Sequence, residues 1–546
     1  MLLGIVILAA ALRLYRIGTK TVWLDEGFSI WMGWHSLPDV IRWSIDIDQH
    51  PPLYYLLLSL WMQIGGTGAA WVRSFSALAG VLTIPVIYLT GKRLSDDVTG
   101  LIAAFILAIN PFQVTYGQEA RTYAFLTLNA ALALYMTARL LTDPNTSRQS
   151  IGSQLEAFFQ TWRRTKKEAD QVEKNAGVGY QQDFRGRRDW VKAPTERRWL
   201  PLHLIQTDLT WLGYMVFTAG TVYCHNTAVF FPFGINLFVF GLIIWRRFFP
   251  AGEKGLHAPS FWNWFWAQIG AAVIWSPWLV AFFAQASGVY GEFWIPKPTL
   301  QIVQDTLKSF FSDNLPQQIA LQGLVWWFFI AALGMGFVHF RKSLPKAFLL
   351  LVVFLAPFLG ELLVSIWRPI FYVRTLIYAP IPLYLLMAAG IRQLRFRPYI
   401  AAALVILVTV NSFSLKEFYF NFQKEAWDEA ATFVAKNVQD GDIILFNAGW
   451  TQIPFDYYFV GYHKPVEEFG APQTMFEYGV LEPIMREKDI PRLRSILLGR
   501  QRVWLVYSHY WYTDPDSLVI GTLRQELRQL KQANFNGMDI YLFGVR

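Results

Sequence analysis

Long apolar stretches with few charges alternate with polar segments along most of the chain. A helix that crosses the hydrocarbon core of a bilayer needs about 20 consecutive, mostly apolar residues. Counted this way, the pattern predicts about eleven membrane-spanning helices, near residues 1–15, 71–91, 98–116, 122–141, 206–224, 228–245, 263–283, 321–340, 346–365, 371–390 and 398–413. Residues 1–413 are therefore expected to form a polytopic α-helical membrane domain, whose first short stretch is an uncleaved helix.

Two polar segments interrupt this domain. Residues 16–70 contain an apolar stretch at 51–66 that is short and ends in Gly65 and Gly66, so we expect a juxtamembrane helix there. Residues 142–203 are polar and basic without apolar periodicity. This insert is expected to be a partly helical or disordered loop whose basic side chains attract anionic membrane lipids.

The character of the chain changes again at residues 414–546. An amphipathic helix is expected over Trp427–Asn437 and another over 517–533, with a turn at Asp440-Gly441 between the first helix and a buried strand. The expected strands are 442–446, 503–507 and 539–545. This alternation predicts a small C-terminal α/β domain with a largely parallel sheet. It contains no glycine-rich nucleotide-binding motif.

The charges orient the helices. The protein is 54% hydrophobic and only 16% charged, with 48 Lys and Arg against 39 Asp and Glu. Clusters of basic residues fall on alternate loops, at 92–93, 142–203, 246–247, 341–346 and 392–397. The positive-inside rule makes these loops cytoplasmic, so the protein is expected in the cytoplasmic membrane with residues 16–70 and the C-terminal domain outside. The net charge of +9 then reflects topology, and nucleic acid is not an expected partner.

Acidic residues follow the first helix. Asp25 and Glu26 are adjacent in Trp23-Leu24-Asp25-Glu26-Gly27, close to the outer bilayer surface. Such a pair can supply a general base. The structural alternative, of about equal weight, is a solvated loop in which Asp25 caps the next helix.

Two further clusters are expected on the same side. Asp48 and His50 precede two prolines that suit a helix start, and Tyr54 follows them. Asp48 and His50 are at most part of a metal site, because a third ligand is not evident. A lone histidine is also more often structural.

The third cluster joins two spans at their outer ends. Glu119 and Arg121 are two residues apart and so do not form a simple helical ion pair. The planar guanidinium of Arg121 matches phosphate oxygens, and Arg374 is a second candidate of this kind on the same side. Snorkelling side chains are the structural alternative.

These motifs carry a resemblance. WLDEG at 23–27, QHPPLYY at 49–55 and YGQEARTYA at 116–124 resemble, in this order, the GT-C superfamily of membrane glycosyltransferases. Within it, the chain is similar to the group of protein O-mannosyltransferases and lipid A aminoarabinose transferases (family 39) and their bacterial relatives. The likeness is close over 1–141 and weaker over 200–413. The C-terminal domain resembles the extracytoplasmic domain of some bacterial members.

The resemblance implies an enzyme that moves a sugar from a polyprenyl-phosphate donor to an acceptor at the outer membrane face, with inversion. Asp25 matches the acidic residue that acts as general base or orients the acceptor, and Glu26 is its neighbour in the motif. Arg121 and Arg374, with His50, Tyr54 and Glu119, are then expected to bind the donor phosphate and substrate. The acceptor is left open among protein, lipid and glycan, as is a divalent metal, and the 142–203 insert has no counterpart.

Two other functions compete with this one. A transporter or flippase of lipid-linked sugar is expected to show charges at mid-membrane or two matching halves with broken helices. The sequence has no clear internal repeat, and its acidic pair lies in an external loop. A sensor or scaffold would need fewer spans. A glycosyltransferase is therefore the leading hypothesis.

Overall fold

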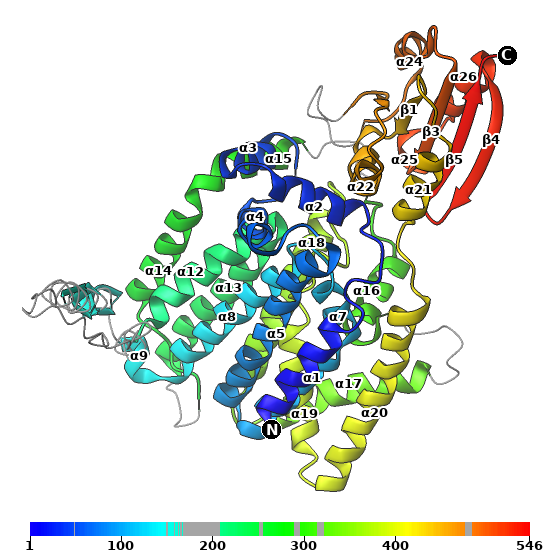
Figure 1. Ribbon diagram of the computed structural model, residues 1–546. Coiled ribbons are helices and arrows are strands. Elements are labelled where there is room, and N and C mark those ends of the chain that lie inside the picture. The colour runs from blue at the N-terminus through cyan, green and yellow to red at the C-terminus, as the bar shows by residue number, and fades with distance from the viewer. Residues whose placement is uncertain are drawn as a thin grey trace, which may run out of the picture.

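The computed structural model describes most of the chain (Figure 1). The described residues are 1–148 without Gln49, part of 151–167, 208–249, 255–288, 295–313, 322–474 and 483–546. Most of the basic insert predicted at 142–203 lies outside them. The structure consists of a large helical part and a smaller C-terminal part built around a sheet.

Each apolar stretch predicted from the sequence contains a helix. These helices are α1 (Leu2–Leu14), α5 (Ala69–Leu94), α6 (Asp97–Ile109), α7 (Pro111–Gly117), α8 (Tyr123–Thr142), α12 (Thr210–Cys224), α13 (Phe230–Phe248), α14 (Phe261–Trp275), α15 (Leu279–Gly288), α17 (Gln322–His339), α18 (Leu344–Val364), α19 (Ile381–Gln393) and α20 (Arg397–Lys416). Among the described residues, six helices are long and apolar enough to cross a membrane, or seven if the bent pair α6–α7 is one span. A multi-pass membrane protein is thus confirmed, and the count of eleven stays a prediction.

The polar segment at 16–70 forms three short helices. They are α2 (Leu24–Trp34), α3 (Leu37–Asp46) and α4 (Leu53–Gly65). The hydroxyl of Ser36 accepts a hydrogen bond from the N–H of Asp39 and so caps α3. α4 starts directly after Pro51-Pro52, where missing N–H groups cost nothing. Its 13 residues are short for a bilayer, as expected for a juxtamembrane helix.

The stretch at 371–390 is helical only in its second half. α19 begins at Ile381, and residues 371–380 form successive turns instead of the predicted helix. Pro380 explains this difference, because it lacks an N–H and disfavours helical geometry in the residue before it. The turns carry Arg374 out of any helix.

A sharp break between α6 and α7 shapes the loop that follows. The two helices are bent by 59°. Asn110 caps α7 by accepting the N–H of Gln113 at 3.1 Å. Arg13 of α1 is buried and donates hydrogen bonds to the carbonyls of Leu107 and Ala108, at 3.3 and 3.1 Å, where α6 ends. A cation at a helix C-terminus also interacts favourably with the helix dipole.

The C-terminal part contains a five-stranded sheet in the order β2-β1-β3-β5-β4. The strands are β1 (Ile443–Asn447), β2 (Glu467–Ala471), β3 (Arg502–Ser508), β4 (Arg528–Phe535) and β5 (Met538–Gly544). β1 is parallel to β2 and β3, whereas β5 is antiparallel to β3 and β4. The sheet is therefore mixed, and the prediction of a largely parallel sheet is wrong.

Helices cover both faces of this sheet. One face packs against α21 (Trp427–Asn437) and α22 (Gln452–Phe459), and the other against α24 (Ile490–Leu497) and α26 (Leu518–Glu526). The helix predicted over 517–533 ends at Glu526, and β4 follows. Gly537, with a φ of +86°, closes the hairpin from β4 to β5. β4 is a largely exposed edge strand. Its polar composition gives no strand pattern, which is why the sequence did not predict it.

The C-terminal part packs directly on α2. A Cβ added to Gly27 would lie 3.2 Å from Cα of Pro454 in α22, closer than ordinary contact. The N–H of Val22 donates to the hydroxyl of Tyr458 at 2.7 Å, and the hydroxyl of Tyr457 donates to the carbonyl of Thr67 at 3.0 Å. The acidic motif at the start of α2 therefore lies between the two parts.

Candidate active site

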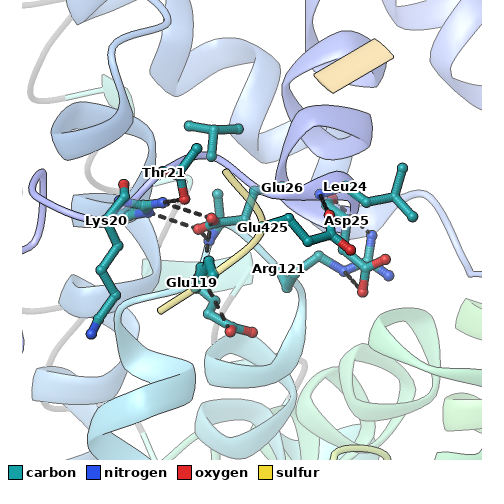
Figure 2. A network of polar contacts seen from close by, with 12 residues as sticks. Lys20, Thr21, Leu24, Asp25, Glu26, Glu119, Arg121 and Glu425 are labelled. Carbon is teal, nitrogen blue, oxygen red and sulfur yellow. Dashed lines mark hydrogen bonds and ion pairs between the residues drawn. The ribbon is translucent and has the colours of Figure 1, made fainter. Parts of the chain in front are cut away.

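The two acidic side chains in the first turn of α2 have different surroundings. Consecutive residues of a helix are rotated by about 100°, so adjacent side chains point in different directions. Figure 2 shows the carboxylate of Glu26 on the side of Lys20 and Thr21, and Asp25 on the side of Arg121. The side chain of Glu26 is 1% exposed and that of Asp25 is 18% exposed. The alternative of a solvated loop capped by Asp25 does not hold.

Glu26 is fully enclosed by hydrogen-bond donors. Arg73 of α5 donates from Nε to Oε1 at 2.8 Å and from Nη2 to Oε2 at 2.7 Å. The N–H of Ala120 donates to Oε1 at 3.0 Å, and Nζ of Lys424 lies 3.1 Å from Oε2. Burial by itself would raise the pKa of Glu26, but Lys424 and Arg73 outweigh it and lower the pKa to about 2. Glu26 is thus an anchor that is charged at neutral pH.

The same lysine connects Glu26 to the third motif. Nζ of Lys424 lies 3.2 Å from Oε1 of Glu119 and 5.3 Å from the ring centroid of Trp23. Burial raises the pKa of Glu119, and the nearby charge of Glu26 adds to this effect, although Lys424 opposes it. Glu119 therefore pairs with Lys424 and not with Arg121, in agreement with the spacing argument.

Asp25 lies between two guanidinium groups. Arg374 donates from Nη1 to Oδ2 at 2.6 Å, and Nε of Arg121 lies 3.8 Å from the same oxygen. Burial favours the neutral acid, but Arg374 and then Arg121 outweigh it, so the pKa of Asp25 is below its usual value. Arg121 also donates to the hydroxyl of Tyr55 at 3.2 Å. Asp25 is therefore an ionised, partly exposed carboxylate flanked by cations.

The turns at 371–380 place Arg374 against α2. The hydroxyl of Thr375 donates to Oε2 of Glu361 at 2.7 Å, which ties the turns to α18. The guanidinium of Arg374 lies over the rings of Tyr372 and Trp23, at 5.0 and 5.8 Å from their centroids. A cation over an aromatic face is held electrostatically. This segment would not reach Asp25 in this way as a continuous helix.

The second motif lies beside this carboxylate. Nδ1 of His50 is 3.0 Å from Oδ1 of Asp48, and the His50 ring contacts that of His225. Tyr54 is buried and hydrogen-bonded to Ser76 at 3.2 Å. Its neighbour Tyr55, which the sequence did not single out, is the tyrosine that contacts Arg121.

The residues described by the structure do not fit a metal site. No three side chains of His, Cys, Asp or Glu among them are grouped to hold an ion. Asp48 and His50 bind each other, and a structural or catalytic zinc needs at least three protein ligands.

The C-terminal part adds two residues that the sequence did not indicate. Glu425 accepts the N–H of Leu24 at 3.3 Å and the indole N–H of Trp427 at 2.6 Å, and it lies 3.3 Å from Nε2 of His509. Burial raises the pKa of Glu425 to about 7 and lowers that of His509 to about 4. Both shifts favour the neutral forms, so at neutral pH this contact is not a full ion pair.

Comparison with known proteins supports the resemblance to membrane glycosyltransferases. Residues 49–153 match the family model of dolichyl-phosphate-mannose-protein mannosyltransferases. This match contains His50, Glu119 and Arg121, and it begins after Asp25. It confirms the predicted resemblance and, with it, the prediction of a glycosyltransferase. No curated protein matches the chain in sequence.

Solved structures show the same fold. ArnT from Cupriavidus metallidurans in the apo state superposes with a TM-score of 0.59 at 12% identity, over 99% of this chain and 97% of that chain. The same protein bound to undecaprenyl phosphate gives a TM-score of 0.56 with the same identity and coverage. The GT-C-like fold predicted from the motifs is confirmed, including a small sheet at the C-terminus.

Proposed function

We propose that this glycosyltransferase moves a sugar from a polyprenyl-phosphate donor to an acceptor hydroxyl at the outer face of the cytoplasmic membrane, with inversion at the anomeric carbon. The observation that carries the proposal is the ionised Asp25 held between Arg121 and Arg374. A base next to two cations is what transfer from a phosphate leaving group needs. The fold shared with a protein that binds undecaprenyl phosphate supports this donor class.

Asp25 is the general base in this reaction. Its carboxylate takes the proton of the acceptor hydroxyl as the hydroxyl oxygen bonds to the anomeric carbon. The bond from that carbon to the phosphate oxygen breaks at the same time, and its electron pair leaves with the polyprenyl phosphate. A single displacement on the face opposite the phosphate inverts the anomeric centre. The low pKa of Asp25 keeps it ionised and ready to accept the proton.

Arg121 and Arg374 stabilise the departing phosphate. A guanidinium donates in a planar fork that fits phosphate oxygens, and both groups are already oriented by protein contacts. Tyr55 contacts Arg121, and His50 lies close to Asp25, so both are further hydrogen-bond donors at this site. Tyr54 positions Arg121 indirectly. Its hydroxyl contacts Ser76, which in turn donates to the carbonyl of Arg121 at 3.3 Å.

Glu26 and Glu119 position these groups. Every hydrogen bond that encloses Glu26 ties α2 to α5, to the loop at 118–122 or to Lys424. This network fixes the helix turn that carries Asp25. Preorganised charge of this kind is what makes electrostatic catalysis effective. The flippase alternative gains no support, since these charges converge on one carboxylate at the edge of the helical part.

The test uses purified full-length protein and a panel of polyprenyl-phosphate sugars. Wild-type protein is expected to consume at least one donor and release polyprenyl phosphate. Asp25→Asn keeps the shape of the side chain and removes the base, which costs about 10²–10⁴-fold in rate. Asp46→Asn, an exposed carboxyl on α3, is the matched control and should retain activity. Turnover of Asp25→Asn near that of wild type, or movement of intact donor across vesicles without consumption, would contradict the proposal.

A further inference from the structure

His509 is held in an unusual backbone conformation at the edge of the site. It follows β3 and has a φ of +55°, in the left-handed region that residues other than glycine rarely adopt. The conformation directs its ring to Glu425, which is bonded to the backbone of Leu24. The charge of Asp25 acts on both His509 and Glu425. Residues far apart in sequence therefore meet on the C-terminal side of the catalytic carboxylate.

Two tryptophans flank this histidine. The ring centroids of Trp450 and Trp511 each lie 4.9 Å from that of His509. Trp511, in the short helix α25 (Tyr510–Thr513), is 64% exposed. Trp450 is 5% exposed, and its indole N–H finds no hydrogen-bond acceptor among the described residues. A buried donor without a partner destabilises the folded protein, so a ligand that accepts this hydrogen bond is bound more favourably.

We propose that Trp450, His509 and Trp511 form the acceptor-binding face of the enzyme and that the acceptor is a saccharide. This inference rests on the proposed function. An exposed indole offers a flat apolar surface for the C–H face of a sugar ring. The indole N–H of Trp450 supplies a hydrogen bond that a sugar hydroxyl accepts. The ring of His509, whose nitrogens contact Ser508 and Glu425, holds both tryptophans in place. Small-ligand sites typically combine aromatic rings with a small number of convergent polar groups.

The position of this face suits an acceptor rather than the donor. Arg121 and Arg374, which bind the donor phosphate in the proposed function, belong to the helical part, whereas His509 and both tryptophans come from the C-terminal part. Asp25 pairs with both arginines, and its charge acts on His509. A base placed between the donor phosphate and the acceptor can take the proton of the attacking hydroxyl while the phosphate leaves on the other side.

The test measures acceptor kinetics with a donor that wild-type protein consumes. Soluble gluco-, manno- and N-acetylglucosamine oligosaccharides are compared with a Ser/Thr-containing peptide. Trp511→Ala should raise the KM for the modified oligosaccharide about tenfold, the value of one lost aromatic contact, and lower kcat by a smaller factor. Trp511→Phe should restore most of the affinity. Trp262→Ala, an equally exposed tryptophan on α14, should match wild type.

The outcomes separate this inference from the proposed function. If wild-type protein consumes no donor, the proposed function itself fails. If donor is consumed and no oligosaccharide is modified, or if Trp511→Ala raises the KM for the peptide and not for a saccharide, the saccharide assignment is overturned. An unchanged KM in both Trp511→Ala and His509→Ala would show that this face does not bind the acceptor.

Discussion

Replacing Glu26 by glutamine tests whether the acidic pair divides into a base and an anchor. Glutamine has nearly the same shape, but its amide group would face the donors of Arg73 and Lys424, which bind Glu26 at 2.7–3.1 Å. Two buried cations would then lack their carboxylate. Removing one partner of a buried ion pair costs about 3–5 kcal/mol.

The pKa of Glu26 gives a second route to this magnitude. It is lowered from 4.5 to about 2, and each unit corresponds to about 1.4 kcal/mol, so the charged contacts outweigh the cost of burial by about 3 kcal/mol. Because the pKa is lowered on folding, this stabilisation is complete above pH 4.5 and is lost as the pH falls towards 2. The variant should therefore differ most from wild type at pH 7 and least near pH 3.

The assay is thermal unfolding of purified protein in detergent, with Tm recorded at pH 7 and pH 3. Glu26→Gln should lower the Tm by several degrees at pH 7, and the difference should shrink at pH 3. Glu429→Gln, at the exposed face of α21, controls for the loss of one charge and should change stability by no more than about 0.5 kcal/mol. A Tm equal to that of this control, or a difference independent of pH, would refute the anchor role.

Two further predictions concern buried arginines. Arg374→Ala removes the cation that contributes most to the low pKa of Asp25, so this pKa should rise by about 1–3 units. Because the base must be ionised, the acid limb of the pH–rate profile should move to higher pH, whereas Arg397→Ala should leave it in place; an unshifted limb contradicts the reasoning. Arg13→Met leaves two buried carbonyls at the end of α6 unpaired, at about 1–3 kcal/mol each. Its Tm should fall below that of the exposed-site control Arg42→Met, and equal values would show that the contact is dispensable.

Local patterns predicted much of the fold. Every apolar stretch contains a helix, and α21 begins and ends as its amphipathic period indicates. The turn at Gly441 and strands β1, β3 and β5 also lie where apolar runs and turn residues placed them. Strand β4 has no apolar run that would predict it, because its residues 528–532 are all exposed.

The site was predictable only in part. The distribution of basic loops placed Asp25, Arg121 and Arg374 on one side of the membrane, and the structure brings them together. The choice between Tyr54 and Tyr55 depends on the phase of α4, since one residue turns a side chain by about 100°. That phase is set by packing rather than by the motif.

Long-range partners were out of reach of sequence patterns. Arg73 had a signal, since a charged residue inside an apolar stretch needs a partner, but the pattern does not say that the partner is Glu26. Lys424 and His509 lie in the C-terminal part, and no spacing rule connects them to α2. Only the packing of that part on Gly27 brings them there.

The contact between Glu26 and Lys424 has a consequence for biosynthesis, because it joins residues 398 positions apart. A ribosome adds about 5–20 residues per second, so Lys424 is made roughly 20–80 s after Glu26. Arg73 follows Glu26 by only 47 positions and can neutralise it early. The carboxylate of Glu26 is thus held by one early partner while the remaining helices enter the bilayer. Full enclosure, and with it a complete reaction site, comes only when the last quarter of the polypeptide has been synthesised.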